Sequence, residues 1–154
     1  MSYFQRLTNS FKNSWLGSPA MLQVAALCYR LTDDGPEILL LTTRGGGKWI
    51  LPKGWPKAEI GAAESALLEA FEEAGIRGRV IGDSIGQYHY TKSSKKGVKL
   101  DCVAVVYEVL LTEIVDDFPE KGERKMAWLS PEKAAKRVDN SELADILRAF
   151  RPSH

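Results

Sequence analysis

The sequence predicts one α/β domain, an α/β sandwich rather than a doubly wound sheet, in which a single central helix lies against a sheet. Residues 62–74 are rich in Ala, Leu and Glu and lack Pro and β-branched residues, which is typical of a helix. Strand-like apolar stretches precede and follow this helix, and further helical patterns end the chain. A chain of 154 residues, 44% hydrophobic and 27% charged, is long enough for one domain with a core.

The first residues predict a separate amphipathic segment. Apolar side chains recur at helical spacing up to residue 15, and residues 17–19 (Gly-Ser-Pro) end the pattern; the apolar positions are Phe4, Leu7, Phe11 and Trp15. We therefore divide the chain into an N-terminal amphipathic segment, 1–20, and a single domain, 21–154. We expect the segment to pack on the domain or on a second copy, which gives a monomer or a homodimer. Residues 1–20 lack a basic leader followed by an apolar stretch. No stretch approaches the roughly 18 apolar residues of a membrane span, so neither membrane insertion nor export is expected.

Residues 23–31 and 37–43 read as a pair of buried strands around the turn at 33–36. A glycine-rich loop, 44–48, then leads to a short apolar strand end at 49–51. Its three glycines are not a P-loop, because the second half of that pattern is missing and no helix follows directly.

After the central helix, residues 79–90 and 99–114 read as two longer strands joined by a loop rich in Lys. Residues 126–129 give another short strand. Ser130 followed by Pro131 predicts the start of a helix, with Ser130 as the N-cap and Pro131 as its first residue. A last helix is expected over 141–150 with Ser141 as its cap.

Charge and cysteine content exclude some functions. The formal net charge of +1 provides no global attraction for nucleic acid or an anionic membrane, so neither is expected as a partner. Cys28 and Cys102 lie far apart in apolar stretches, without a CxxC pattern or His partners. They are interpreted as reduced core thiols of a cytoplasmic protein.

The central helix carries three carboxylates on one face. Glu69, Glu72 and Glu73 stand at i, i+3 and i+4, and no Lys or Arg lies between Gly61 and Ile76 to neutralise them. One interpretation is a solvated acidic stripe. The other is a site for a hard divalent cation, which would compensate the repulsion.

This arrangement resembles the signature of the Nudix hydrolases, a Gly followed after a fixed loop by an Arg-Glu-apolar-x-Glu-Glu-x-Gly-apolar helix. The matching positions are Gly54, Glu69, Ala70, Glu72, Glu73, Gly75 and Ile76. Two positions depart from the pattern: the loop Glu of the family falls at Ile60, and its Arg is Leu68 here. In the family that Arg orients the neighbouring carboxylates, so its replacement concerns catalytic strength rather than fold.

The resemblance implies a Nudix-type α/β/α sandwich with a mixed sheet and a catalytic central helix, over roughly residues 21–151. It implies Glu69, Glu72 and Glu73 as catalytic residues. Together with the carbonyl of Gly54, they would hold Mg²⁺ or Mn²⁺ ions that bridge the phosphates of the substrate.

Hydrolysis of a phosphoanhydride needs neutralised phosphates, a positioned water and a metal that lowers the pKa of that water. Spacing does not tell which carboxylate acts as base, because pKa values depend on the folded surroundings. Glu69 is the first candidate, and Glu120 or Glu123 from the later loop is the second.

Basic residues from four separate segments predict a rim for a highly phosphorylated small molecule. The expected substrate-binding residues are Arg44, Lys48, Lys53, Lys92, Lys95, Lys96, Lys99, Arg124 and Lys125. A solvated hairpin tip remains the alternative for the lysine-rich loop.

The order of these features looks like the diphosphoinositol polyphosphate phosphohydrolase branch, which also includes diadenosine polyphosphate hydrolases. The shared segments are 48–52 (Lys-Trp-Ile-Leu-Pro), the lysine-rich loop, and 122–128. This implies hydrolysis of diphosphoinositol or dinucleoside polyphosphates. The alternatives are a non-catalytic polyphosphate-binding domain and a pyrophosphatase for another nucleoside diphosphate derivative.

Overall fold

The computed structural model describes residues 20–94 and 96–153. The predicted amphipathic helix, within residues 1–19, and the candidate residue Lys95 lie outside the described residues. No helix in the described part of the chain is long and apolar enough to cross a membrane.

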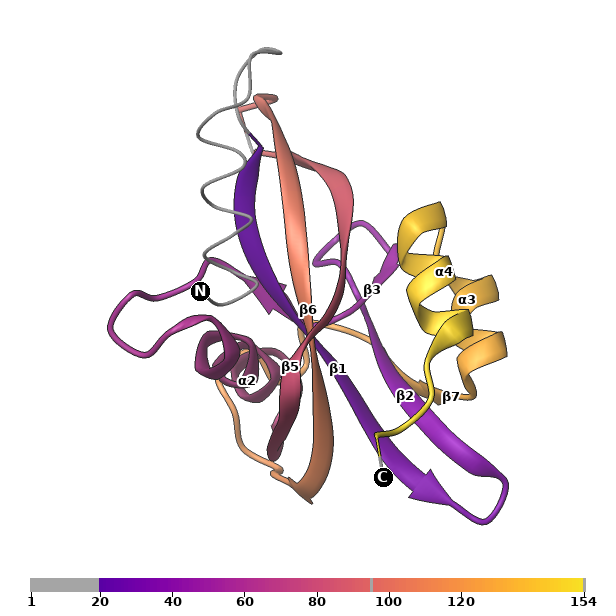
Figure 1. Cartoon of the computed structure of the whole chain (residues 1–154). Helices are drawn as coiled ribbons and strands as arrows, with labels where there is room; N and C mark the ends of the chain where they lie inside the picture. Colours follow the sequence, from indigo (N-terminus) through magenta and orange to yellow (C-terminus); the bar gives the residue numbers. More distant parts are fainter. Residues whose placement is uncertain (1–19, 95, 154) are drawn as a thin grey trace.

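The described residues form one seven-stranded mixed sheet with helices on both faces (Figure 1). Its main strand order is β3-β2-β1-β6-β5, with β4 pairing to β1 and β7 to β2. Within residues 20–94 and 96–153, β1 and β6 pair in parallel, and the other pairs are antiparallel. The elements are β1 (Met21–Thr32), β2 (Gly35–Thr42), β3 (Trp49–Ile50), β4 (Lys53–Gly54), α2 (Ala62–Ala74), β5 (Ile76–Ser93), β6 (Lys99–Ile114), β7 (Met126–Leu129), α3 (Pro131–Arg137) and α4 (Ser141–Ala149). The predicted α/β/α sandwich with a mixed sheet is confirmed.

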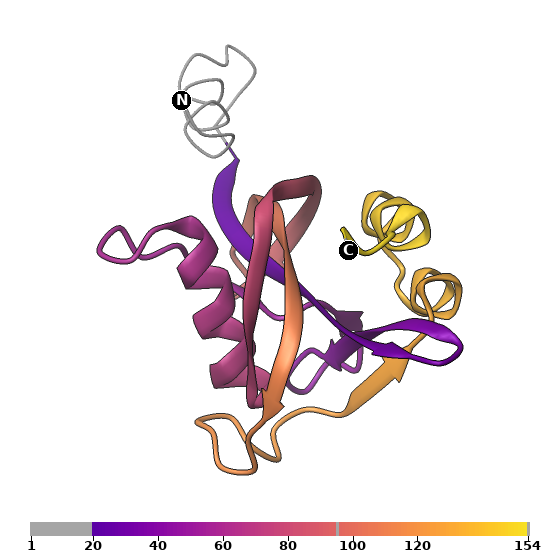
Figure 2. The ribbon, with the colours of Figure 1, turned by 60° about the horizontal axis from the view of Figure 1, so that its bottom comes forward.

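The central strands β1 and β6 are buried on both faces and separate two apolar cores. Val24, Ala26 and Cys28 point to the core under α2. Ala25 and Leu27 alternate with them and point to the core under α3 and α4. Figure 2 shows α2 on one side of the sheet and the two C-terminal helices on the other. The predicted central helix therefore has a layer of its own.

Helix α2 spans Ala62–Ala74, as the sequence predicts, and Gly75 ends it in the left-handed conformation with φ 68°. A side chain at Gly75 would also collide with Phe118 and with the carbonyl of Val115. Ala66 and Ala70 face the sheet, and their small size lets the helix lie close to it. Glu73 shares this buried face, so it is not part of a solvated stripe.

Two local expectations from the sequence were wrong. The cap of α4 is Asn140, whose side chain accepts from the backbone N–H of Leu143, while Ser141 is already the first helical residue. Strand β5 begins at Ile76 rather than residue 79, directly after α2. Register shifts between Arg77 and Gly78, and again after Ile81, interrupt its pairing with β6 and hid the strand pattern. The cap of α3 is Ser130, as predicted.

Candidate active site

The site begins where Gly54 of β4 meets α2. Gly54 pairs with Val24 of β1, which fixes the loop against the sheet. A Cβ atom at Gly54 would overlap the carboxylate of Glu69. Gly54 is thus required because the carboxylate of Glu69 lies against its backbone, and not because of an unusual backbone conformation.

Glu73 is the most deeply buried acid of the helix, with 4% of the residue exposed. Its Oε1 lies 3.4 Å from the backbone N of Lys53, and its carboxyl group shares a hydrogen bond with Glu69. Burial raises the pKa of Glu73 to about 9, and the hydrogen bond to Glu69 adds to the rise. Burial also raises the pKa of Glu69. At neutral pH these shifts favour the protonated form of Glu73.

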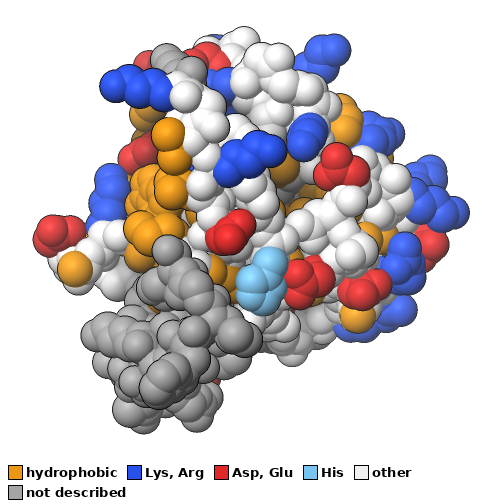
Figure 3. All heavy atoms as spheres, turned by 90° about the horizontal axis from the view of Figure 1, so that it is seen from above, with side chains coloured by type: hydrophobic (Ala, Val, Ile, Leu, Met, Phe, Trp, Pro, Cys, Tyr) orange, Lys and Arg blue, Asp and Glu red, His pale blue; other side chains and the backbone are white. Residues whose placement is uncertain are grey.

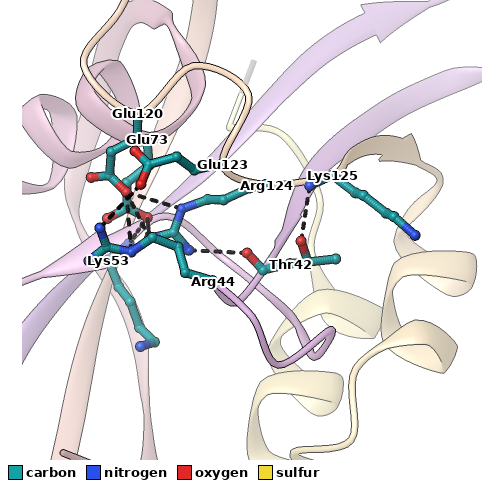
Figure 4. Close-up of polar contacts among 8 residues, drawn as sticks. All are labelled: Thr42, Arg44, Lys53, Glu73, Glu120, Glu123, Arg124 and Lys125. Carbon is teal, nitrogen blue, oxygen red and sulfur yellow. Dashed lines mark hydrogen bonds and ion pairs between the residues drawn. The ribbon is translucent and has the colours of Figure 1, made fainter. Parts of the chain in front are cut away.

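The loop between β6 and β7 adds a third carboxylate and a cation (Figure 4). The backbone N–H of Glu120 donates to the carbonyl of Glu72 at 2.9 Å, which ties the loop to α2. Arg124 Nη2 lies 3.0 Å from Glu120 and 3.9 Å from Glu73, and Arg124 Nη1 donates to the carbonyl of Thr42 at 3.1 Å. With only 10% of its side chain exposed, Arg124 is held on acceptors of the protein itself.

Glu72 lies at the outer edge of this group. Its side chain is 30% exposed, and its Oε1 stands 4.0 Å from the ammonium of Lys57. The backbone N–H of Lys57 in turn donates to Ser65 Oγ at 2.8 Å, so the loop before α2 is fastened to the first turn of the helix.

The residues present fit a hard divalent cation. Glu69, Glu73 and Glu120 interact with one another through a shared hydrogen bond and the common Arg124, next to the Gly54 loop. Oxygen ligands with several negative charges suit Mg²⁺ or Mn²⁺. Among residues 20–94 and 96–153, no three His, Cys, Asp or Glu side chains are arranged as a preformed metal centre. Arg124 lies next to these carboxylates, and the raised pKa of Glu73 favours its uncharged form.

The predicted basic residues fall into three groups. Arg44 lies near the acidic loop, 3.8 Å from Glu120 and 3.5 Å from Glu123. Lys125 reaches Thr42 through its backbone N–H, while its side chain extends away from the carboxylates (Figure 4).

Lys53 and Lys92 form the second group, on the sheet face opposite α2. The ammonium of Lys53 lies 4.2 Å from the ring centroid of Tyr90, and that of Lys92 lies 5.1 Å from the ring of Trp55. Burial lowers the pKa of Lys53 to about 8, and the charge of Lys92 lowers it further.

The third group, Lys48, Lys96 and Lys99, is exposed. Lys96 and Lys99 belong to the end of the β5–β6 hairpin, at the top of Figure 1. Figure 3 views the molecule from this end and shows basic side chains next to exposed apolar ones. A role in substrate binding for the basic residues stays a prediction.

The two positions that depart from the signature lie together. Ile60 and Leu68 line one hollow of about 470 Å³ on the outer side of α2, with Leu67 and Phe71. Leu68 thus points to an apolar surface that includes Ile60. The cation next to the buried carboxylates comes from Arg124, far along the sequence.

A family model for the NUDIX domain matches residues 21–150, which is most of the chain. The chain belongs to the NUDIX domain family. Of the signature positions, Gly54, Glu69 and Glu73 lie together in the structure.

Relatives and solved structures agree with this assignment. The chain is 28% identical over 134 residues to the diphosphoinositol polyphosphate phosphohydrolase 3-beta of Bos taurus, covering 86% of this chain and 72% of that protein. It is 31% identical over 131 residues to the chloroplastic Nudix hydrolase 21 of Arabidopsis thaliana, covering 82% of this chain and 64% of that protein. The crystal structure of a C. elegans Ap4A hydrolase binary complex resembles the fold with a TM-score of 0.62 and 22% identity, over 84% of this chain and 93% of that one.

Sequence reasoning missed the buried polar groups on the opposite face of the sheet of this Nudix domain. Gln23 is completely buried, and Tyr88 is 2% exposed. The amide of Gln23 and the hydroxyl of Tyr88 have no hydrogen-bond partner among the described residues. A Gln at an inward position of a buried strand was the available signal, because an apolar residue is the rule there.

Proposed function

We propose that this chain is a metal-dependent hydrolase of a phosphoanhydride bond in diphosphoinositol polyphosphates or dinucleoside polyphosphates. The observation that carries the proposal is the packing of Gly54 against Glu69, with Glu73 and Glu120 joined to them by Arg124. The named activities of the bovine and nematode relatives support these two substrate classes.

Glu69, Glu72, Glu73 and the carbonyl of Gly54 would hold Mg²⁺ or Mn²⁺. When bound, the metal supplies charge neutralisation at the phosphates and lowers the pKa of a bound water. Before binding, Glu73 must release its proton, because a carboxylate ligand is ionised. Arg124 then keeps Glu120 next to the helix, so that Glu69 and Glu120 both remain candidates for the general base.

Turnover assays test the proposal directly. The protein is incubated with Mg²⁺ or Mn²⁺ and, separately, with a diphosphoinositol polyphosphate and with diadenosine tetraphosphate, and the products are separated by chromatography. We expect release of phosphate or nucleotide, which Glu73→Gln abolishes. Glu64→Gln, in the first turn of the same helix, is the matched control and should retain activity. No product from any of these compounds at high protein concentration would sink the idea.

A second candidate is a polyphosphate-binding Nudix domain without catalysis. Leu68 and Ile60, which replace the charged residues of the signature with an apolar surface, favour it. Calorimetry separates the two functions: tight binding, with the ligand recovered intact after incubation with metal, favours the binding domain.

For the cellular setting we propose the cytoplasm and a monomer or homodimer. Cys28 and Cys102 are both buried and free, which fits a reducing compartment. Sedimentation of the full chain distinguishes the two oligomeric states.

A further inference from the structure

The hollow on the outer side of α2 is an apolar surface between that helix and the start of β5. Its apolar lining residues are Ile60, Leu67, Leu68, Phe71 and Ile76. Ile60 is 44% exposed, and the three apolar residues from α2 are only half-buried. The hollow measures about 470 Å³, within the roughly 300–1,000 Å³ of pockets that bury most of a ligand. Apolar side chains exposed together in this way mark a contact surface.

The side chains of α2 that line the hollow form two ridges. Glu64 and Leu68 stand four residues apart on one ridge, and Leu67 and Phe71 stand four residues apart on the next. The space between two such ridges receives a ridge of another helix. An amphipathic helix binds a surface of this kind through apolar side chains at i, i+3 and i+7. The hollow therefore suits an amphipathic helix.

The N-terminal segment of the same chain, residues 1–20, has this pattern. Its apolar positions are Phe4, Leu7, Phe11 and Trp15. They stand at i, i+3, i+7 and i+11, which would place them in one stripe of a helix. Three of the four are aromatic, and aromatic side chains contribute the largest contact area for each residue. The sequence thus supplies an apolar stripe, and the described domain supplies an open apolar hollow.

The charges of the two surfaces are complementary. Glu64 lines the hollow and forms no ion pair with any residue in 20–94 or 96–153, whereas Arg77, the other charged lining residue, lies 4.0 Å from Glu113. The N-terminal segment contains Arg6 and Lys12 and no Asp or Glu. Lys12 borders the apolar stripe on a helical wheel. A cation would therefore arrive at the unpaired carboxylate together with the apolar side chains.

The start of β1 lies close enough for the segment to reach the hollow. Leu22, the second residue of β1, packs against the same core cluster as Leu67, which lines the hollow. Residues 16–20, between the apolar stripe and β1, can span about 16 Å when extended. So short a tether gives the segment an effective concentration on the order of millimolar at the hollow. This advantage favours the segment of the same chain over a second copy or a separate partner.

We propose that residues 4–15 of this chain pack as an amphipathic helix in the hollow between α2 and β5. The family pattern has charged residues where this chain has Ile60 and Leu68, and the segment covers the apolar surface that replaces them. Helix α2 is then packed on both sides, against the sheet and against the segment. The inference goes beyond the proposed function and does not depend on it.

Thiol labelling of the full chain tests the proposal. Ile60→Cys and, in a second protein, Leu68→Cys each place one thiol in the hollow, and the rate of reaction with a fluorescent maleimide is measured. Cys28 and Cys102 are buried, so the wild type gives the background rate. We expect Phe11→Asp to raise the labelling rate of both hollow thiols by about 10- to 100-fold, the factor that corresponds to exposing one buried Phe.

Two controls accompany the measurement. Asn13→Asp introduces the same side chain and the same change in charge on the opposite side of the helical wheel, so it should leave both rates unchanged. Leu31→Cys supplies the rate of an unprotected thiol, because Leu31 is 58% exposed near the end of β1. The turn between β1 and β2 lies on the other side of the molecule from α2 (Figure 1). Phe11→Asp should not alter the labelling of Leu31→Cys.

Two results would overturn the proposal: hollow thiols that react as fast as that of Leu31→Cys in the chain with Phe11 intact, or rates that Phe11→Asp leaves unchanged. If Ile60→Cys or Leu68→Cys fails to fold, the other position decides. Labelling is repeated across a hundredfold dilution, with sedimentation at each concentration. Protection that disappears on dilution as a dimer dissociates would assign the hollow to the segment of a second copy and would also overturn the proposal.

Discussion

Replacing Glu73 with Gln should stabilise the metal-free protein while removing its activity. The amide of Gln can reproduce the hydrogen bonds of the protonated acid: its Oε1 accepts from the backbone N–H of Lys53, and its Nε2 donates to Glu69. It carries no proton to lose, so it cannot become a charged metal ligand. The substitution therefore separates the effect of the buried acid on stability from its role as a metal ligand.

The magnitude follows from the pKa of Glu73, which rises from an ordinary value of 4.5 to about 9 in the fold. At pH 7 the folded protein keeps a proton that the unfolded chain has released. The distance from the ordinary pKa to pH 7 corresponds to a loss of up to about 3 kcal/mol in the free energy of unfolding. Because folding raises the pKa of Glu73, the proton bound to Glu73 contributes to the stability of the folded state. This contribution is complete below about pH 4.5 and is lost as the pH rises towards about 9.

The assay is urea unfolding in EDTA between about pH 5 and about pH 9, with the free energy of unfolding compared at each pH. We expect the advantage of Glu73→Gln over the wild type to grow with pH, by up to about 1.4 kcal/mol per unit. Addition of Mg²⁺ should stabilise the wild type and not the variant. Glu72→Gln, whose carboxylate is partly exposed, is the control and should give a smaller advantage. An advantage that is constant or shrinks across this range would refute the reasoning.

Three further substitutions address the same site. Gly54→Ala should lower kcat by about 100-fold, because its Cβ displaces Glu69, while the urea midpoint stays near that of the wild type; normal turnover would show that the carboxylate position is not critical. Arg124→Ala should lower the free energy of unfolding by about 3 kcal/mol in urea, because it leaves the largely buried carboxylate of Glu120 without its ion-pair partner and the carbonyl of Thr42 without its donor, and a change below about 1 kcal/mol would contradict that role. Leu68→Arg should change kcat by less than about twofold in assays with limiting Mg²⁺, because Arg124 already provides the nearby cation, and a large gain in rate would show that it does not.

The regular elements could be predicted from the sequence because their signals are local. The composition of residues 62–74 and the glycine after them were sufficient for α2, and Ser130 with Pro131 was sufficient for the start of α3. The sequence predicted too short a strand for β5, because two register shifts interrupt the alternation of its side chains. For α4, two adjacent residues, Asn140 and Ser141, both suit a cap, and only the folded backbone selects between them.

The site was predictable only in part, because some of its contacts are local and others join segments distant in sequence. The spacing of Glu69 and Glu73 brings them to one helix face, but their proximity to Gly54 and the burial of Glu73 depend on the sheet packed against the helix. The substrate-binding role of Arg124 stays a prediction, but its contact with the carbonyl of Thr42 joins segments distant in sequence and is contained in no local pattern.

The departures from the Nudix signature are best understood as a linked change. In the family pattern an Arg and a loop Glu stand where this chain has Leu68 and Ile60, and here both side chains line the same hollow. A charged residue next to an apolar one in this hollow would be poorly solvated, whereas two apolar residues give a compatible contact. The buried carboxylates keep a cation in Arg124, which does not line that hollow. The loss of the signature Arg therefore changes the outer surface of α2 while the charge balance next to Glu73 is maintained from the β6–β7 loop.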